Sequence, residues 1–201
     1  MSHYVYLVRH GEQQDAEHGV LDTPLSERGK RQVELLAERL RDVPFSAVYT
    51  SPLDRASQTA EVLAEHGVTP APQSSLLLYD CVPSGLTDDT PPGYERFFAA
   101  IDPSDVEAGE AQMADAADTF LARSRDDQHT LLISHNFVIG ALVQAAMELP
   151  SWRWLAMNCY HASLTILRIR TKKPAELLVF NDAGHLPGGL RTGAPLSEFA
   201  V

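Results

Sequence analysis

Val5-Tyr6-Leu7-Val8-Arg9-His10-Gly11-Glu12 is the stretch of sequence that decides the fold. Its first four residues are apolar and too few for an ordinary helix, so they predict a short buried strand. Arg9 and His10 follow where this strand ends. Because open α/β sheets bind ligands beyond the carboxyl ends of their strands, this placement favours chemistry over packing. Taken alone, the stretch from Arg9 to Glu12 favours chemistry only weakly over an ordinary polar strand end.

Two further predicted strands end in polar residues of the same kind. Ala47–Thr50 is followed by a helix predicted from Asp54 to His66, which places Arg55 in the first helical turn. Backbone N–H groups at such a helix start favour anions. Thr130–Ser134 is an apolar strand that is followed directly by His135 and then by an apolar helix. Two histidines and two arginines are therefore expected at the ends of three strands.

These residue types suit phosphoryl chemistry. An imidazole titrates near neutrality and can attack phosphorus as a nucleophile. A guanidinium stays charged and binds two phosphate oxygens at once. The pattern therefore predicts an enzyme that works through a phosphohistidine.

The chain resembles the histidine phosphatase superfamily, also called the phosphoglycerate mutase-like family. The resemblance spans nearly the whole chain and implies one domain over residues 1–201, a three-layer α/β/α sandwich with a mostly parallel central sheet. It rests on four elements in the family's order, which are Arg9-His10-Gly11, Leu25-Ser26-Glu27-Arg28-Gly29, Ser51-Pro52-Leu53-Asp54-Arg55 and Ser134-His135. Each element is weak alone, but four in register form a specific signal.

The resemblance also implies roles for these residues. His10 would attack the phosphoryl group and become phosphorylated, with one ring nitrogen holding its proton against a backbone carbonyl near Gly11. Arg9, Arg55 and His135 would surround the phosphoryl oxygens and stabilise their charge during an in-line transfer. Such a site requires no metal ion and no other cofactor.

The leaving oxygen needs a proton, which the family usually takes from a glutamate after a central strand. Ser75–Tyr79 is predicted to be that strand, and Asp80 follows it. The stretch Asp80-Cys81-Val82-Pro83 is similar to a Leu-x-Glu-Gly-x-Pro element of the branch that contains mitochondrial and signalling-type protein phosphatases, with aspartate for glutamate and cysteine for glycine. We predict Asp80 as the general acid, with a turn-forming role as the alternative. Glu12 is the second candidate, but together with Gly11 it is rather expected to position the substrate.

Several departures from the family pattern favour a phosphatase over a mutase. Mutases carry a polar Ser/Thr and an asparagine after the Arg-His-Gly motif, and Ala16 stands where that asparagine would be. The segment from Asp80 to Thr130 is short for a mutase, which must exclude water from its intermediate. The chain is therefore predicted to hydrolyse phosphomonoesters. A phosphoglycerate mutase, a protein phosphatase and a catalytically weak phosphate-binding scaffold remain as alternatives.

Composition limits the partners. The 201 residues carry 16 basic and 27 acidic side chains, and the net charge of −11 argues against binding nucleic acid or anionic membranes. No apolar stretch is long enough to span a membrane. With no export signal and only two cysteines, a cytoplasmic location is expected. The remaining histidines show no zinc-type spacing. The expected partner is a small phosphomonoester or a phosphoprotein, and a homo-oligomer stays open.

The other elements complete the expected organisation. Residues that could contact the rest of the substrate are Ser84, Tyr94, Arg96 and His185. Further helices and strands are predicted from Ser26 to about Asp42, Tyr94 to Ile101, Glu107 to Arg125, His161 to Arg170 and Glu176 to Asn181, with a turn at Lys172-Lys173-Pro174 between the last two.

Overall fold

The protein is built on one six-stranded sheet in the order β3-β2-β4-β1-β5-β6. The computed structural model describes residues 1–15 and 22–194, so the part of the predicted domain at 16–21, with Ala16, and at 195–201 lies outside the described residues. Among the strands, only β5 runs against the others, because β1, β2, β3 and β4 pair in parallel and β6 returns antiparallel to β5. The strands are β1 (Ser2–Arg9), β2 (Ala47–Thr50), β3 (Gln73–Ser74), β4 (Gln128–Ser134), β5 (Leu164–Arg170) and β6 (Lys173–Asp182).

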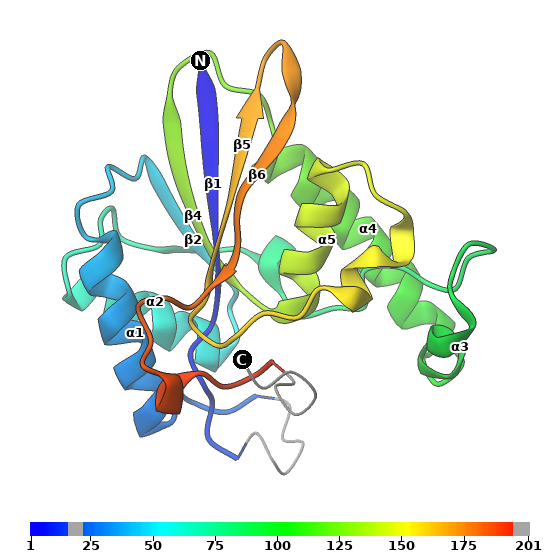
Figure 1. Ribbon diagram of the computed structural model, residues 1–201, viewed down its shortest axis with the longest axis horizontal. Coiled ribbons are helices and arrows are strands. Elements are labelled where there is room, and N and C mark those ends of the chain that lie inside the picture. Colours follow the sequence, from blue (N-terminus) through cyan, green and yellow to red (C-terminus); the bar gives the residue numbers. More distant parts are fainter. Residues whose placement is uncertain (16–21, 195–201) are drawn as a thin grey trace.

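Helices cover both faces of this sheet. Figure 1 shows α1 and α2 on one side of the strands and α4 and α5 on the other, so the predicted three-layer α/β/α architecture is confirmed. No helix of the described ranges is long and apolar enough to cross a membrane. The helices are α1 (Glu27–Leu40), α2 (Asp54–Glu65), α3 (Pro92–Phe98), α4 (Pro103–Phe120) and α5 (Asn136–Ala146), with short 3-10 turns η2 (Leu76–Leu78), η3 (Ser151–Ala156) and η4 (Gly188–Leu190).

Successive residues of the central strands face opposite layers. Leu7 and Leu132 pack in the core that includes α5, whereas Val8 and Ile133 pack in the core beneath α1 and α2. All four side chains are fully buried. Burial on both faces explains why β1 and β4 are continuous apolar runs in the sequence. The two cores hold the carboxyl ends of these strands in place.

The predicted strand Ser75–Tyr79 is wrong. β3 is shorter and pairs only Gln73 and Ser74 with β2, and η2 follows it. In a strand, Leu76 and Leu78 would point to the same face. Here Leu76 is 74% exposed and Leu78 is fully buried, which a helical turn accommodates and a strand does not.

Some helix boundaries also differ from the predictions. α3 begins at Pro92 and α4 at Pro103, because proline suits the first helical turn, where its missing N–H is not needed. Asp102 caps α4 by accepting a hydrogen bond from the Ser104 N–H at 2.8 Å. β6 begins at Lys173, so the turn before it lies one residue earlier than predicted.

Candidate active site

The polar residues that follow β1, β2 and β4 lie side by side. The backbone N–H of His10 donates to the Ser134 carbonyl at 3.0 Å, and that of Ser51 donates to the Ile133 carbonyl at 3.0 Å. The sheet pairing thus continues just past the strands and brings their ends together. The ring centroids of His10 and His135 are 5.2 Å apart.

The His10 ring is held in one neutral form. Its Nδ1 donates to the Gly11 carbonyl at 2.8 Å, and its Nε2 accepts from the Nε–H of Arg55 at 3.2 Å. Since the carbonyl can only accept and the guanidinium can only donate, the proton lies on Nδ1 and the lone pair on Nε2. Burial, reinforced by the neighbouring His135 and Arg9, holds the pKa of His10 well below its usual value. In this neutral form the ring can act as a nucleophile through Nε2.

Arg55 connects this histidine to two carboxylates. It lies in the first turn of α2 and is almost fully buried. Its Nη2 donates to Oδ2 of Asp80 at 3.0 Å, and its Nη1 donates to Oδ1 of Asp22 at 3.2 Å. One guanidinium thus contacts the histidine and the predicted acid.

Arg9 reaches the same cluster from the end of β1. Its Nη1 donates to the carbonyls of Cys159 at 2.5 Å and of Gly193 at 2.9 Å. Burial lowers the pKa of Arg9 to about 10, which still leaves it charged at neutral pH. Its Nε is buried and has no hydrogen-bond partner among the described residues. Such an orphaned donor is what a bound anion would satisfy.

His135 carries a second orphaned atom. Its Nε2 shares a hydrogen bond with the Ser51 hydroxyl at 2.9 Å. Its Nδ1 is buried without a hydrogen bond in the described structure and lies 3.8 Å from Oδ2 of Asp80. Burial, together with Arg55 and Arg9, holds the pKa of His135 well below its usual value. A dianion bound beside this ring would oppose that shift and favour the charged imidazolium.

The two candidate acids have different surroundings. Burial raises the pKa of Asp80, although Arg55 and Arg9 oppose the shift, and its side chain remains 41% exposed. A raised pKa suits a general acid. The Glu12 carboxylate instead accepts hydrogen bonds from Ser26 at 2.9 Å and Arg28 at 3.0 Å at the start of α1. These contacts favour a positioning role for Glu12.

Glycine is needed at two positions in the Arg-His-Gly and Leu-Ser-Glu-Arg-Gly motifs. A Cβ at Gly11 would lie 2.8 Å from the Gly29 carbonyl oxygen, and a Cβ at Gly29 would lie 2.0 Å from the Glu12 carbonyl oxygen. Both distances are too short for real atoms, so the loop after β1 and the first turn of α1 can approach this closely only with glycine at both positions. This approach fixes the loop that orients His10.

His161 belongs to the cluster, although the sequence did not mark it. Its ring centroid lies 5.5 Å from that of His10, and its Nδ1 shares a hydrogen bond with the Thr192 hydroxyl at 3.0 Å. The burial of the ring, together with Arg9 and other nearby cations, lowers its pKa to about 2. His161 lies just before β5, and because β5 runs antiparallel to β1, the start of β5 lies at the carboxyl end of β1. This pairing, which would have marked His161, cannot be seen in the sequence.

Asp22 is the other residue that the sequence analysis missed. Besides Arg55, it accepts a hydrogen bond from the backbone N–H of Asp54 at 3.2 Å, at the start of α2. It therefore fixes the guanidinium relative to the helix that carries it. No spacing in the sequence connects this loop residue with α2.

The segment after β6 returns to the site as a strap, Leu190–Gly193. Gln32 of α1 donates to the Leu190 carbonyl at 2.7 Å and to the Thr192 hydroxyl at 2.9 Å. A Cβ at Gly193 would lie 2.7 Å from Nδ1 of His161 and 2.8 Å from Nη1 of Arg9. The strap thus lies against the cluster and fits it closely.

A cavity of about 570 Å³ opens beside Arg55 and Asp80. The predicted contacts Ser84, Tyr94, Arg96 and His185 are absent from its described lining. Ser84 instead donates to the Ser151 carbonyl and accepts from the Trp154 indole, so its hydroxyl is used in packing. The remaining lining residues are Asp22, Leu53, Tyr79, Cys81, Val82, Asp105, Ala108, Gly109 and Phe137.

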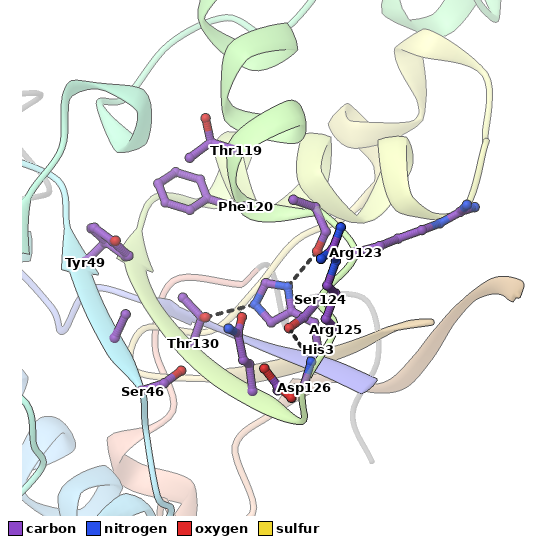
Figure 2. A pocket seen from close by; sticks show the side chains of 13 residues that line it. His3, Ser46, Tyr49, Thr119, Phe120, Arg123, Ser124, Arg125, Asp126 and Thr130 are labelled. Atoms are coloured by element: carbon purple, nitrogen blue, oxygen red, sulfur yellow. Dashed lines mark hydrogen bonds between the residues drawn. The ribbon is translucent and has the colours of Figure 1, made fainter. Parts of the chain in front are cut away.

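A second cavity, of about 540 Å³, lies at the opposite end of the sheet (Figure 2). Its labelled side chains include Arg123 and Arg125, and His3 lies among them with dashed lines to its partners. Among the described residues, no group of three or more His, Cys, Asp or Glu side chains could hold a metal ion, here or at the first cavity.

The fold and the cluster define an α/β protein with arginines and buried histidines gathered at the carboxyl ends of a mostly parallel sheet. The family model described as histidine phosphatase superfamily (branch 1) matches residues 5–77 and 88–182. The chain belongs to this superfamily, which confirms the resemblance inferred from its motifs.

The named proteins that are similar in sequence to this chain include protein phosphatases. The mitochondrial serine/threonine-protein phosphatase Pgam5 of Caenorhabditis briggsae is 28% identical over 198 residues, which cover 92% of this chain and 65% of the relative. The Drosophila melanogaster protein of the same name is 27% identical over 198 residues, covering 94% and 66%. The chain thus spans slightly less than two thirds of these relatives' length. Their names place those proteins in mitochondria, whereas the cytoplasmic location of this chain stays a prediction.

Solved structures share the fold. YhfR of Bacillus stearothermophilus superposes with a TM-score of 0.72 at 24% identity, over 91% of this chain and 98% of that chain. A phosphoserine phosphatase of Entamoeba histolytica gives a TM-score of 0.70 at 20% identity, over 92% and 100%. At such identities the likeness concerns the architecture, and the chemistry must be argued from the residues.

Proposed function

We propose that this protein hydrolyses phosphomonoesters through a phosphohistidine formed on His10. The observation that carries the proposal is the His10 ring itself, which the Gly11 carbonyl and the Arg55 guanidinium hold neutral with its lone pair on Nε2. Nothing in packing requires a buried histidine to face an arginine. The arrangement suits attack on a phosphoryl group that the same arginine binds.

The first step transfers the phosphoryl group to the protein. Arg9, Arg55 and His135 bind its oxygens and stabilise the charge that spreads over them. Nε2 of His10 forms a bond to phosphorus while the bond from phosphorus to the ester oxygen breaks. Protonated Asp80 gives its proton to that leaving oxygen, so the alcohol departs neutral.

The second step releases phosphate. Asp80, now a carboxylate, accepts a proton from a water molecule whose oxygen attacks phosphorus as the bond to Nε2 breaks. Inorganic phosphate leaves, and His10 and Asp80 return to their starting protonation states. The raised pKa of Asp80 supports this exchange of roles, because the group must both hold and release a proton near neutral pH.

The position of Asp80 favours an enzyme over a scaffold. A carboxylate turned away from His10 would leave the pocket able only to bind phosphate. Asp80 instead lies 3.0 Å from the guanidinium that contacts His10. A phosphoprotein substrate is the second candidate, because the Pgam5 relatives are named serine/threonine-protein phosphatases.

Trapping the intermediate tests the proposal. Wild type and His10→Ala would be mixed with phosphomonoesters, including sugar phosphates, nucleotides, phosphoglycerate and phosphopeptides, with phosphate release and acid-labile phosphoprotein both measured. We expect release and labelling by the wild type only. His66→Ala, at an exposed histidine on the end of α2, is the control that should retain both signals. Labelling that persists in His10→Ala would overturn the assignment of the nucleophile.

A further inference from the structure

The cavity beside Arg55 is placed to receive the part of the substrate that leaves. Arg55 belongs both to the phosphoryl-binding cluster and to the cavity wall, and Asp80, the proposed donor to the leaving oxygen, lines the same cavity. An ester whose phosphoryl group Arg55 binds beside His10 therefore extends its alcohol portion into this space. The chemistry of the wall then decides which alcohols fit.

The wall is fixed by contacts between α4 and the segment that follows η2. Gln112 of α4 donates to the Tyr79 carbonyl at 2.8 Å and to the Leu77 carbonyl at 3.3 Å. A Cβ at Gly109 would lie 1.9 Å from the Val82 carbonyl oxygen, so only glycine lets the helix approach so closely. The cavity is thus formed before any ligand arrives, as ligand sites usually are.

Most of the wall is apolar. Leu53, Tyr79, Val82 and Phe137 come from three different segments, and each is at least partly exposed in the structure. Apolar surface that converges on one cavity gains free energy when a ligand covers it. The wall therefore favours an alcohol or phenol with an apolar or aromatic body.

The charges on the wall are mainly negative. Its lining holds the carboxyl groups of Asp22, Asp80 and Asp105, of which the proposed mechanism needs Asp80 protonated, against one cation, Arg55. Arg55 already pairs with the first two. Asp105 has no ion pair with any described residue and lies exposed in the first turn of α4. A second anionic group on the substrate would meet this carboxylate, and the described lining offers no cation besides Arg55, which already binds the phosphoryl group in the proposed mechanism.

We infer that the substrates are phosphomonoesters whose leaving group is apolar or aromatic and carries no second negative charge. This inference rests on the proposed function and narrows it to a substrate class. It disfavours phosphoglycerates and bisphosphates, and with them the mutase alternative, because their second anionic group would lie against Asp105 and its neighbours.

Four alkyl phosphates test the inference, namely ethyl phosphate, phenylethyl phosphate, phosphoethanolamine and phosphoglycolate. Their leaving groups are all poor, so differences in kcat/KM report mainly on the cavity. We expect phenylethyl phosphate to exceed ethyl phosphate by about 10-fold through burial of the ring. Phosphoglycolate should fall about 10-fold below ethyl phosphate through repulsion by the carboxylates. Phosphoethanolamine, with its cationic tail, should not fall below ethyl phosphate.

A matched pair of variants locates the effect. Asp105→Asn should reduce the penalty on phosphoglycolate about 3-fold or more, because it removes one unpaired charge from the wall. Asp118→Asn, at an exposed aspartate of the same helix outside the cavity, should leave the penalty unchanged. An equal reduction of the phosphoglycolate penalty in both variants would mean that the net charge of the protein, and not the cavity wall, disfavours anionic leaving groups. That result would overturn the inference.

The outcomes separate the inference from the proposed function. Hydrolysis that depends on His10 but is fastest for phosphoglycolate, or shows no gain from the phenyl ring, would overturn the inference and leave the phosphatase standing. No hydrolysis of any ester and no labelling of His10 would remove the phosphatase, and the substrate class with it.

Discussion

The two ends of the sheet carry cavities of nearly equal size, with buried His3 at one end and buried His10, His135 and His161 at the other, yet their surroundings differ. At the amino ends of the strands, both ring nitrogens of His3 are satisfied, by the Ala122 carbonyl at 2.9 Å and the Thr130 hydroxyl at 2.8 Å (Figure 2). At the carboxyl ends, Nδ1 of His135 and Nε of Arg9 lack partners in the described structure. Volume, a buried imidazole and a partnerless arginine nitrogen occur at both ends, because Nε of Arg170 beside the amino end of β1 also lacks a partner among the residues described. The difference is that Arg170 is paired with Glu176, whereas at the carboxyl ends Arg9 and Arg55 gather around histidines.

The direction of the helices explains the difference. α2 and α5 begin at the carboxyl ends of the strands, so their N–H groups and positive dipole ends favour a bound anion there. α4 ends at Phe120, beside the other cavity, where its carbonyl groups point outward. Such an end favours cations, which agrees with Arg123 and Arg125 lying nearby. The helix ends therefore favour a bound anion at the carboxyl ends of the strands rather than beside Phe120.

Replacing His10 or His3 with alanine tests the comparison of the two ends most directly. His10→Ala removes the proposed nucleophile, so we expect kcat/KM to fall by about 10⁴-fold or more. His3→Ala removes two satisfied hydrogen bonds far from the reaction and should leave kcat within about 3-fold, while lowering the free energy of unfolding by about 1–3 kcal/mol. Phosphate release and urea unfolding measure the two effects. A comparable loss of kcat in a folded His3→Ala protein would break the comparison.

Arg55→Ala should produce the next largest effect. It removes a buried cation that contacts His10 and Asp80, and the loss of one charge-stabilising donor costs about 10²- to 10³-fold in kcat. Arg55→Lys keeps the charge but cannot contact three partners in one plane, so only partial recovery is expected. Steady-state kinetics and vanadate binding would measure both variants. Full recovery with lysine would show that the charge alone matters.

Asp80→Asn should have an effect that depends on the leaving group. An amide cannot give up a proton, so turnover of alkyl phosphates should fall about 100-fold, whereas that of nitrophenyl phosphate should change less than about 5-fold. The wild type should also lose activity as the pH rises through the elevated pKa of Asp80, and the variant should not. Equal losses on both kinds of ester would count against Asp80 as the acid.

The smallest effect concerns stability at low pH. Because the pKa of His161 is lowered to about 2 in the folded protein, only the unfolded chain takes up this proton as the pH falls below the usual value of 6.5. Stability is therefore complete above that pH and is lost as the pH falls toward the folded pKa. His161→Asn should reduce the slope of unfolding free energy between about pH 6 and pH 5 by up to about 1.4 kcal/mol per pH unit. His66→Asn, at an exposed histidine, is the control. If the unfolding free energy of the wild type and both variants depended on pH with the same slope, the lowered pKa of His161 would be refuted.

The sequence was sufficient to predict that the residues at the carboxyl ends of the parallel strands lie close together. Arg9, His10 and His135 could be predicted to converge because a parallel sheet places its strand ends at one edge, and Arg55 because it opens the next helix. Asp80 reaches the cluster as predicted, although a 3-10 turn and not a strand carries it there. Three consecutive leucines, Leu76 to Leu78, have no periodicity that would distinguish the two.

His161 and Asp22 could not be predicted because their positions depend on long-range packing. His161 reaches His10 only because β5 pairs antiparallel with β1. Asp22 reaches Arg55 across a loop whose path no local pattern specifies. Both depend on how separate segments meet in space, which hydrophobic periodicity does not encode.

The strap over Arg9 has a consequence for how the protein is made. Arg9 is synthesised before its carbonyl partner Gly193, which follows 184 residues later. The contact therefore forms only after Gly193 has also emerged from the ribosomal exit tunnel. Until then, Arg9 lacks one of its two carbonyl partners, so the cluster around His10 is completed only once the strap has been made.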